Sequence, residues 1–234
     1  MAIARGLTSP IRRLPDFVVI GTQRGGTTSL HNWLGQHPDL HPSNGKEVHY
    51  FDDNFERPVR WYRSHFSVRR SGLAFESTPS LLYEPDAPGR FQQVLPAAKA
   101  VVVLRNPVHR AVSQYHHEYG RGSETRPLLE AIWSTPTSRH NAYLHRGQYV
   151  GQLRRWVDTV GWGRLLVLVS EEIYADPQAA VDSVADRIGV SRYPILPTHR
   201  NRQSYGSTEV HGLEDYFAPY NAELEEFLGR ALPW

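Results

Sequence analysis

Three short apolar runs, far apart along the chain, limit the possible folds more than any other feature. They cover residues 17–20, 100–104 and 165–169, and each is continuously apolar and rich in valine or leucine. Strands of this kind are typical of a parallel sheet that is covered on both faces. A weaker fourth run lies at residues 73–76. The sequence therefore predicts four strands of one mostly parallel sheet.

Helical patterns lie between these runs. Residues 30–34 carry apolar side chains at i, i+3 and i+4, and residues 147–161 and 176–190 also have helical spacing. Asn106 is a suitable N-cap, because a proline follows it in the first turn. Strands that alternate with helices predict an α/β fold, a mostly parallel central sheet flanked by helices, with a P-loop-like arrangement.

Bulk properties narrow the function classes. The length of 234 residues suits a single domain over residues 1–234, and we expect residues 1–15 to be a flexible N-terminal segment. A net charge of +2 gives little support to nucleic-acid binding, and the lack of cysteine excludes disulfides and thiolate chemistry. No apolar run is long enough for a signal peptide or a membrane span, so the sequence favours a cytoplasmic protein.

A glycine-rich loop follows the first run. Its sequence GTQRGG, residues 21–26, has the Gly-x-x-x-x-Gly spacing of a P-loop, whose backbone N–H groups surround phosphate oxygens. Thr27 replaces the lysine of a P-loop, and Arg24 is the only cation of the loop. Thr28 and Ser29 follow, and such hydroxyl residues are also common helix caps. The loop alone is therefore compatible with either an anion site or a structural turn.

Arg105 follows the buried run at 100–104. In a P-loop ATPase a strand of the sheet often ends in an aspartate that holds Mg²⁺. An arginine at such a place repels a divalent cation and attracts an anion, unless it is the partner of a structural ion pair. Because the carboxyl ends of parallel strands meet at one edge of a sheet, the loop and Arg105 predict two neighbouring anion sites and no metal site.

One nucleotide matches two anion sites without magnesium. It is 3′-phosphoadenosine 5′-phosphosulfate (PAPS), whose sulfuryl group carries less negative charge than a terminal phosphoryl group. The glycine loop would bind the 5′-phosphosulfate at the start of a helix. Arg105 and Ser113 would bind the 3′-phosphate. The sequence therefore predicts PAPS as cofactor and 3′-phosphoadenosine 5′-phosphate (PAP) as its product.

Several segments resemble the PAPS-dependent sulfotransferases, particularly the branch with heparan sulfate sulfotransferases and their bacterial relatives. GTQRGGTTSL is similar to the family's 5′-phosphosulfate loop, LRNPVHRAVSQY to its 3′-phosphate motif, and KEVHYFD to the segment that carries its general base. Less specific similarity extends over residues 76–82, 146–156 and 216–229. The resemblance thus covers most of the chain, and its three main motifs together are strong.

The resemblance implies roles for individual residues. Glu47 would be the general base, His49 would orient Glu47 or contact the acceptor, and Lys46 would assist. Arg24, in place of the family's loop lysine, would stabilise charge on the transferring group. Taken without the resemblance, Glu47 and Lys46 are equally compatible with solvated loop residues. The implied donor-binding residues are Arg24, Gly25, Gly26, Thr27, Thr28, Ser29, Arg105, Ser113 and, in a lid at 199–207, Arg200 and Arg202.

Two departures from the family pattern affect these expectations. Arg24 can clamp an anion with two donors, but it is a poorer proton donor than lysine. Ser77 stands where relatives that act on heparan sulfate often have a lysine, which argues against a highly anionic glycan acceptor. The expected acceptor is a hydroxyl on a sugar or a glycosylated small molecule.

Two alternatives remain open at this point. An ATP-dependent kinase with a degenerate P-loop would need Mg²⁺, and Glu171 and Glu172 after the run at 165–169 are its nearest candidates for a metal site. We expect these two glutamates to have structural roles. A noncatalytic nucleotide-binding protein would keep both loops and could dispense with Glu47. The adjacent residues His116 and His117 point to different sides of a helix, so they do not predict zinc binding.

Overall fold

The computed structural model describes residues 12–68, 71–197 and 210–234. Residues 1–11, most of the segment expected to be flexible, and the proposed lid with Arg200 and Arg202 lie outside these ranges. The strands are β1 (Phe17–Gly21), β2 (Leu40–Pro42), β3 (Leu73–Ser77), β4 (Lys99–Leu104) and β5 (Leu165–Val169). The α-helices are α2 (Thr27–Leu34), α3 (Val59–Arg63), α4 (Ala87–Val94), α5 (Pro107–Gly120), α6 (Leu128–Trp133), α7 (Tyr149–Val160), α8 (Ser170–Ala175), α9 (Pro177–Ile188) and α10 (Leu213–Leu228).

The strands form one sheet in the order β2-β3-β1-β4-β5, and all neighbouring pairs are parallel. The predicted α/β fold is confirmed, and each of the four predicted runs forms a strand. The fifth strand, β2, was not predicted. It has only three residues and ends at Pro42, so it carries no apolar run that a sequence pattern could reveal. Its pairing with β3 at the sheet edge, with Leu40 opposite Leu73, is what makes it a strand.

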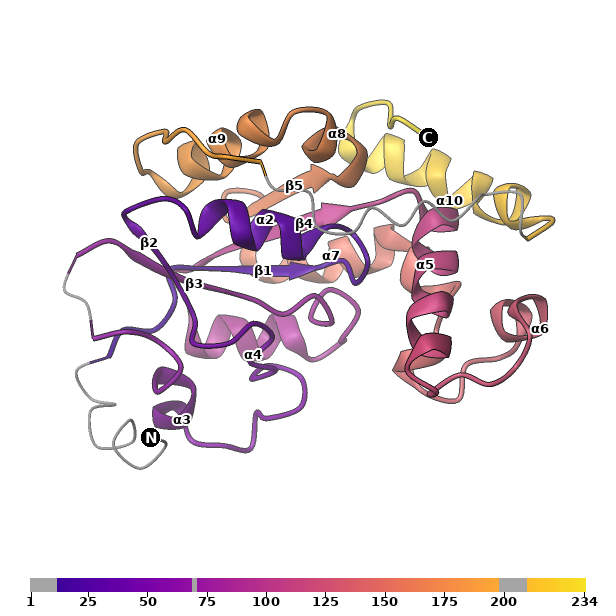
Figure 1. Ribbon diagram of the computed structural model, residues 1–234, viewed down its shortest axis with the longest axis horizontal. Coiled ribbons are helices and arrows are strands. Elements are labelled where there is room, and N and C mark those ends of the chain that lie inside the picture. The colour runs from indigo at the N-terminus through magenta and orange to yellow at the C-terminus, as the bar shows by residue number, and fades with distance from the viewer. Residues whose placement is uncertain (1–11, 69–70, 198–209) are drawn as a thin grey trace.

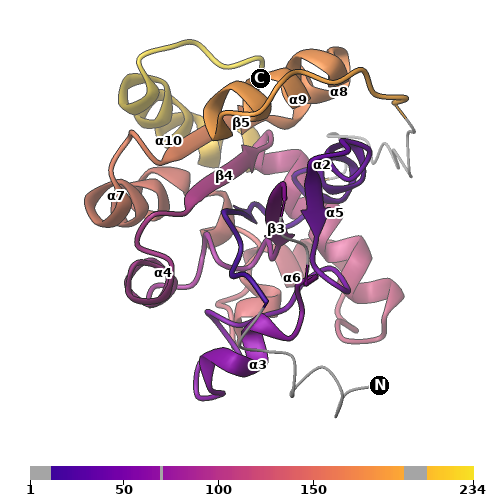
Figure 2. The same cartoon turned by 90° about the vertical axis from the view of Figure 1, so that its left-hand side faces the viewer.

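Helices cover both faces of the sheet (Figures 1 and 2). On β1, Phe17 and Val19 belong to one apolar cluster, and Val18 and Ile20 belong to another. Helices α2, α8 and α9 contribute to the first cluster, while α3, α4, α7 and the C-terminal half of α10 contribute to the second. Because successive side chains of a strand point to opposite faces, this two-sided burial requires the continuous apolar runs that the sequence contains.

A third apolar cluster lies beyond the carboxyl end of β4. It joins α5, α6 and the first half of α10, which stand together on one side of the molecule (Figure 1). Helix α5 begins at Pro107, and the Oδ1 of Asn106 accepts hydrogen bonds from the N–H groups of Val108 and His109. The predicted cap at Asn106 is therefore confirmed. This helix forms one wall of the space at the carboxyl edge of the sheet.

Within the described ranges, no helix has both the length and the apolar character that crossing a membrane requires.

Candidate active site

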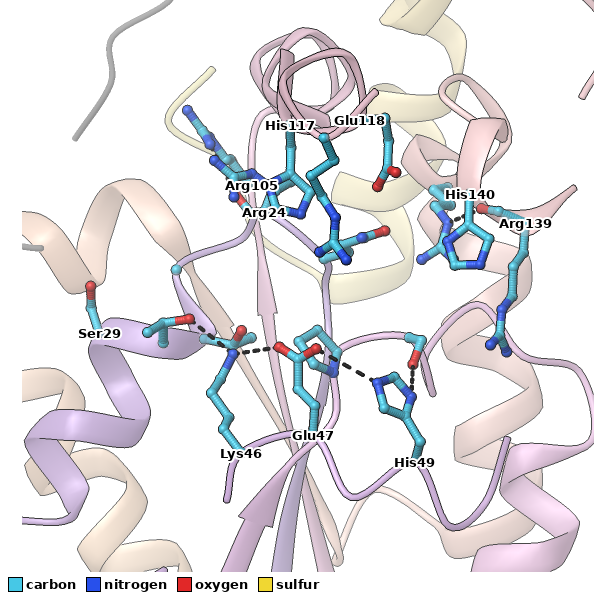
Figure 3. Close-up of a pocket in the computed structure, with 18 of the residues that line it drawn as sticks. Arg24, Ser29, Lys46, Glu47, His49, Arg105, His117, Glu118, Arg139 and His140 are labelled. Carbon is cyan, nitrogen blue, oxygen red and sulfur yellow. Dashed lines mark hydrogen bonds and ion pairs between the residues drawn. The ribbon is translucent and has the colours of Figure 1, made fainter. Parts of the chain in front are cut away.

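A cavity of about 980 Å³ opens at the carboxyl edge of the sheet. Its walls come from the loop after β1, the segment after β2, the end of β4, and segments on and beyond α5 (Figure 3). It brings together most of the predicted site residues, namely Arg24, Gly26, Thr27, Thr28, Ser29, Lys46, Glu47, His49 and Arg105. Gly25 and Ser113 do not line it, but Gly25 lies between Arg24 and Gly26 in the chain, and Ser113 accepts a hydrogen bond from Arg24.

The glycine loop runs close against β4. The N–H of Thr22 donates to the carbonyl oxygen of Val103, and a Cβ placed on Gly25 would lie 2.5 Å from that same oxygen. Gly26 then adopts a φ of 96° as the N-cap of α2. These two positions explain the glycines physically. Gly25 needs the space, and Gly26 needs the left-handed backbone conformation that side chains disfavour.

In the part of the chain that the structure describes, no side chain caps the start of α2. The alternative in which the hydroxyl residues serve as caps is therefore wrong for this helix. Instead, Thr28 accepts a hydrogen bond from the ammonium group of Lys46, and Ser29 shares one with Tyr174. Among the described residues, no side chain accepts from the backbone N–H groups of the first turn, and such a turn favours an anion.

Two arginines stand beside this turn. The Nε of Arg24 donates to the Oγ of Ser113 at 3.0 Å, and an Nη of Arg105 donates to the carbonyl oxygen of Arg24 at 2.9 Å. Burial lowers the pKa of Arg105, the charge of Glu171 opposes this shift, and the charge of Arg24 adds to it. In the described part of the chain, neither guanidinium has a carboxylate within ion-pair distance. The pair therefore attracts an anion.

The segment after β2 presents a row of polar side chains to the cavity (Figure 3). Lys46 lies 2.7 Å from the carboxylate of Glu47, whose other oxygen lies 3.7 Å from the Nε2 of His49. The Nδ1 of His49 lies 2.9 Å from Asp52, whose side chain is fully buried and also accepts a hydrogen bond from Ser80. His49 thus stands between two carboxylates.

These contacts fix the charges of the row. The contact with His49, at 3.7 Å, is the main reason why the pKa of Glu47 falls to about 2. The hydrogen bond to Asp52, followed by the longer contact with Glu47, raises the pKa of His49 to about 10. Burial alone would raise the pKa of Asp52, but the hydrogen bonds from His49 and Ser80 outweigh it and lower that pKa to about 2. At neutral pH, Glu47 is therefore a carboxylate and His49 an imidazolium.

The backbone is strained at one residue of the glycine loop and at two residues of this row. Arg24, Glu47 and His49 have φ values of 68°, 64° and 55°, and within the described ranges they are the only residues other than glycine with positive φ. All three line the cavity. Non-glycine residues in this region cost about 1–3 kcal/mol and cluster at functional sites. Strain at three cavity residues marks this cavity as the functional site.

Neighbouring segments hold the strained turn in place. The N–H of Glu47 donates to the carbonyl oxygen of Ser77, and the N–H of His49 donates to the Oγ1 of Thr78. Glu76, also fully buried on β3, accepts hydrogen bonds from Thr78 and from the phenol of Tyr62. Burial raises the pKa of Glu76. Sequence reasoning missed this support, because Glu76 was read only as the end of a strand.

Asp52 is a second residue that the sequence interpretation missed. It lies three positions after His49 in KEVHYFD, and that spacing could have suggested an ion pair. His49, Asp52 and Asp53 also form a group whose ligand atoms are close enough to hold a metal ion. Arg139 pairs with Asp53 and lies 3.7 Å from Asp52, so a cation already balances the two carboxylates.

The two glutamates that a kinase would need have other partners. Glu171 accepts a hydrogen bond from the backbone N–H of Asn106, and Glu172 forms an ion pair with Arg230 at 2.7 Å. The structural roles expected for them are confirmed.

Comparisons with known proteins agree with this geometry. The family model described as "Sulfotransferase domain" matches residues 14–215. Human heparan sulfate glucosamine 3-O-sulfotransferase 6 is 32% identical over 185 residues, which cover 77% of this chain and 54% of that protein. The chain thus spans about half the length of this relative.

Solved structures show the same fold. The crystal structure of a sulfotransferase from Alicyclobacillus acidocaldarius matches with a TM-score of 0.81 and 27% identity, covering 94% of this chain and 98% of that one. Mouse sulfotransferase SULT7A1, solved as a complex with PAP, matches with a TM-score of 0.54 and 18% identity over 81% of this chain and 64% of that one, a likeness of fold alone. Since the family model covers most of the chain, this protein belongs to the sulfotransferase family and is a sulfotransferase enzyme.

Proposed function

We propose that this sulfotransferase takes its sulfuryl group from PAPS and transfers it to a hydroxyl of a carbohydrate or a glycosylated small molecule. The observation that carries the proposal is the adjacency of Arg24 and Arg105, both without carboxylate partners in the described ranges, beside the uncapped start of α2. A donor with two separate anionic groups would supply acceptors for both guanidinium groups and for the N–H groups at the start of α2.

The residues of the cavity fit this donor chemically. The first turn of α2 offers backbone N–H groups, and Thr27 and Thr28 add hydroxyls, so this end suits the 5′-phosphosulfate. Arg105 and Ser113 suit the 3′-phosphate, and the bond from Arg24 to Ser113 links the two places. Arg200 and Arg202 stay predictions, because they lie outside the described residues. The volume of about 980 Å³ leaves room for an acceptor beside a nucleotide.

Glu47 is the proposed general base. PAPS would supply the sulfuryl group, and PAP would be the leaving group. As the acceptor oxygen forms its bond to sulfur, its O–H bond breaks and the proton passes to Glu47. Glu47 is ionised at neutral pH and has no proton to lose first. General base catalysis of this kind contributes roughly 10²–10⁴-fold.

Lys46 and His49 would position this base. Each contacts one oxygen of the Glu47 carboxylate, so together they fix its orientation. Lys46 also contacts Thr28 at the start of α2 and thereby ties the base to the donor loop. Arg24 would stabilise negative charge on the transferring group, as a fixed cation rather than as a proton donor.

A carbohydrate acceptor has support from the relatives. One of them is named as a heparan sulfate glucosamine 3-O-sulfotransferase, and the segment with Glu47 lies within the part of the chain that the family model matches. Because the present chain spans only about half of that protein, its acceptor is proposed from chemistry and not transferred by name.

The donor is tested by thermal shift in EDTA. PAP should raise the melting temperature more than ATP does, and Arg105→Ala should remove most of that difference. A kinase would show the reverse preference once Mg²⁺ is added. Equal stabilisation by ATP and PAP would contradict the proposed donor.

The base is tested separately, by incubation with PAPS and a panel of hydroxylated acceptors, with the mass gain of one SO₃ unit as readout. Glu47→Gln should bind PAP normally and lose transfer, whereas Glu56→Gln, an exposed residue outside the cavity, should retain both. Full activity of Glu47→Gln would refute its role. A wild-type protein that binds PAP but modifies no acceptor would support a noncatalytic nucleotide-binding protein.

A further inference from the structure

Arg146 is a buried cation in the wall of the cavity. Its side chain is 3% exposed, its Nε donates to the carbonyl oxygen of Arg139 at 2.9 Å, and its guanidinium lies 4.7 Å above the ring of Tyr83. Among the residues that the structure describes, none accepts a hydrogen bond from its two terminal nitrogens, and no carboxylate lies within ion-pair distance. Arg146 is one of the residues that line the cavity, so these nitrogens are unused donors of a lining side chain.

A buried charge without a partner is costly. Burial is the main reason why the pKa of Arg146 falls to about 9, and the charge of the neighbouring Arg110 lowers it further. Arg110 is also fully buried, but its terminal nitrogens donate to Gln114 and to the carbonyl oxygen of Tyr143. Within the described residues the Nε of Arg110 also lacks a partner, but Arg110 does not line the cavity. Arg146 is therefore the member of this pair whose unused donors belong to a cavity-lining side chain.

Arg146 lies away from the proposed donor site. It is bonded to Arg139, and Figure 3 shows Arg139 and His140 on the opposite side of Glu47 from Ser29 and the start of α2. Glu47 thus stands between the donor loop and this cationic end. A group that binds Arg146 would therefore be part of the acceptor.

We propose that Arg146 binds an anionic group of the acceptor, a carboxylate or a sulfate or phosphate ester, while the reacting hydroxyl lies at Glu47. This inference rests on the proposed function, since it names the acceptor class of the same site. A guanidinium with both terminal nitrogens unused suits an oxyanion, because its planar fork matches two oxygens. The ring of Tyr83 and the carbonyl of Arg139 hold that fork in place before binding.

The serine at position 77 does not contradict an acceptor with an anionic group. The expectation of a weakly charged acceptor came from the serine at that position. Ser77 is fully buried, and its Oγ shares a hydrogen bond with His31 instead of lining the cavity. The cation that recognises the acceptor comes from a different segment.

The test uses the full chain saturated with PAP, which fills the donor site. Four probes share one scaffold: neutral 4-nitrophenyl glucoside, the corresponding glucuronide, and the 6-sulfate and 6-phosphate of the glucoside. Calorimetric titration should show that at least one anionic probe binds about tenfold or more tightly than the neutral one. The three anionic probes distinguish a carboxylate from a sulfate or phosphate ester.

Variants test whether Arg146 causes the preference for anionic over neutral probes. Arg146→Gln should bind the neutral probe as the wild type does and lose the anion preference, while Arg146→Lys should keep part of it. Arg154→Gln, an exposed arginine on α7 outside the cavity, should leave it unchanged. Should Arg146→Gln fail to fold, Tyr83→Leu removes the ring that supports the guanidinium and should weaken the preference.

The remaining outcomes of these titrations would contradict either the role of Arg146 or the proposed donor. A wild-type protein that binds PAP but binds all four probes equally would overturn this inference and leave the proposed donor intact. A preference that persists in Arg146→Gln would also overturn it. Failure to bind PAP would overturn the proposed function, and this inference with it.

Discussion

The Nε of Arg24 donates to the Oγ of Ser113 at 3.0 Å and joins the loop after β1 to helix α5. Arg24 has a left-handed backbone conformation, and Ser113 is buried. The sequence placed the two residues at opposite ends of the donor, whereas the fold brings their side chains into contact. The bond holds a strained loop against a helix that is anchored by its own cap at Asn106.

Ser113→Ala should therefore weaken PAP binding by about tenfold or more, because a hydrogen bond that involves a charged group contributes about 1.5–3 kcal/mol. Isothermal titration with PAP measures the change. Ser183→Ala is the matched control, since Ser183 donates only to a carbonyl oxygen of its own helix. Unchanged PAP affinity in Ser113→Ala would show that this link is dispensable.

The charges around His49 predict a pH-dependent contribution to stability. Its pKa in the folded protein, about 10, lies above the ordinary value of 6.5. The protonated side chain thus favours folding fully below pH 6.5, and this contribution is lost as the pH rises through about 10. The partners Glu47 and Asp52 have pKa values lowered to about 2, so their contribution is present above their ordinary values of 4.5 and 3.8 and is lost as the pH falls towards 2.

His49→Gln should consequently lower the melting temperature most between about pH 4.5 and 6.5, and the gap to the wild type should close towards pH 10. Thermal unfolding across pH 4–10 measures it. His211→Gln, at an exposed position, should show no such pattern. A gap of constant size over this range would contradict the assigned ion pairs.

The sequence predicted what local patterns encode. Continuous apolar runs identify strands buried on both faces, and Asn106 followed by a proline identifies a helix start. The glycine spacing located the loop, and the arginine after β4 lines the same cavity as that loop. These features depend on neighbours in sequence, so one chain was sufficient to find them.

The parts that could not be predicted depend on distant contacts. The strand β2 exists because Leu40 pairs with β3, and its own three residues carry no pattern. Arg139 and Arg146 come from a segment without regular periodicity, and only the packing of that segment near α5 brings them to the cavity. The partners of Arg139 and the burial of Arg146 follow from that packing, which a sequence does not display.

Glu76 should prove to be a positioning residue for the base. Glu76→Ala leaves the hydroxyls of Tyr62 and Thr78 buried without their acceptor, at about 1–3 kcal/mol each. The backbone N–H of Val48, between the strained residues Glu47 and His49, also interacts with this carboxyl group. Urea unfolding should therefore show a large loss of stability, and kcat should fall more than PAP affinity.

Tyr62→Phe is the matched variant for Glu76, because it leaves one carboxyl oxygen without its donor and should cost about 1–3 kcal/mol, whereas Glu76→Ala leaves two buried hydroxyls without their acceptor. Its kcat should stay close to that of the wild type. If Glu76→Ala costs no more than Tyr62→Phe, or leaves kcat unchanged, Glu76 has no part in holding the turn.

The approach of the glycine loop to β4 yields a last prediction. A Cβ on Gly25 would lie 2.5 Å from the carbonyl oxygen of Val103 and 2.9 Å from that of Thr22, and neither backbone atom can move aside cheaply. Gly25→Ala should cost about 1–3 kcal/mol and lower the melting temperature by about 2–12 °C. It should also weaken PAP binding, since the loop must shift away from β4. Gly163→Ala is the control, because nothing lies within 4 Å of its added Cβ. If the two variants melt alike and bind PAP alike, the close approach does not shape the donor loop.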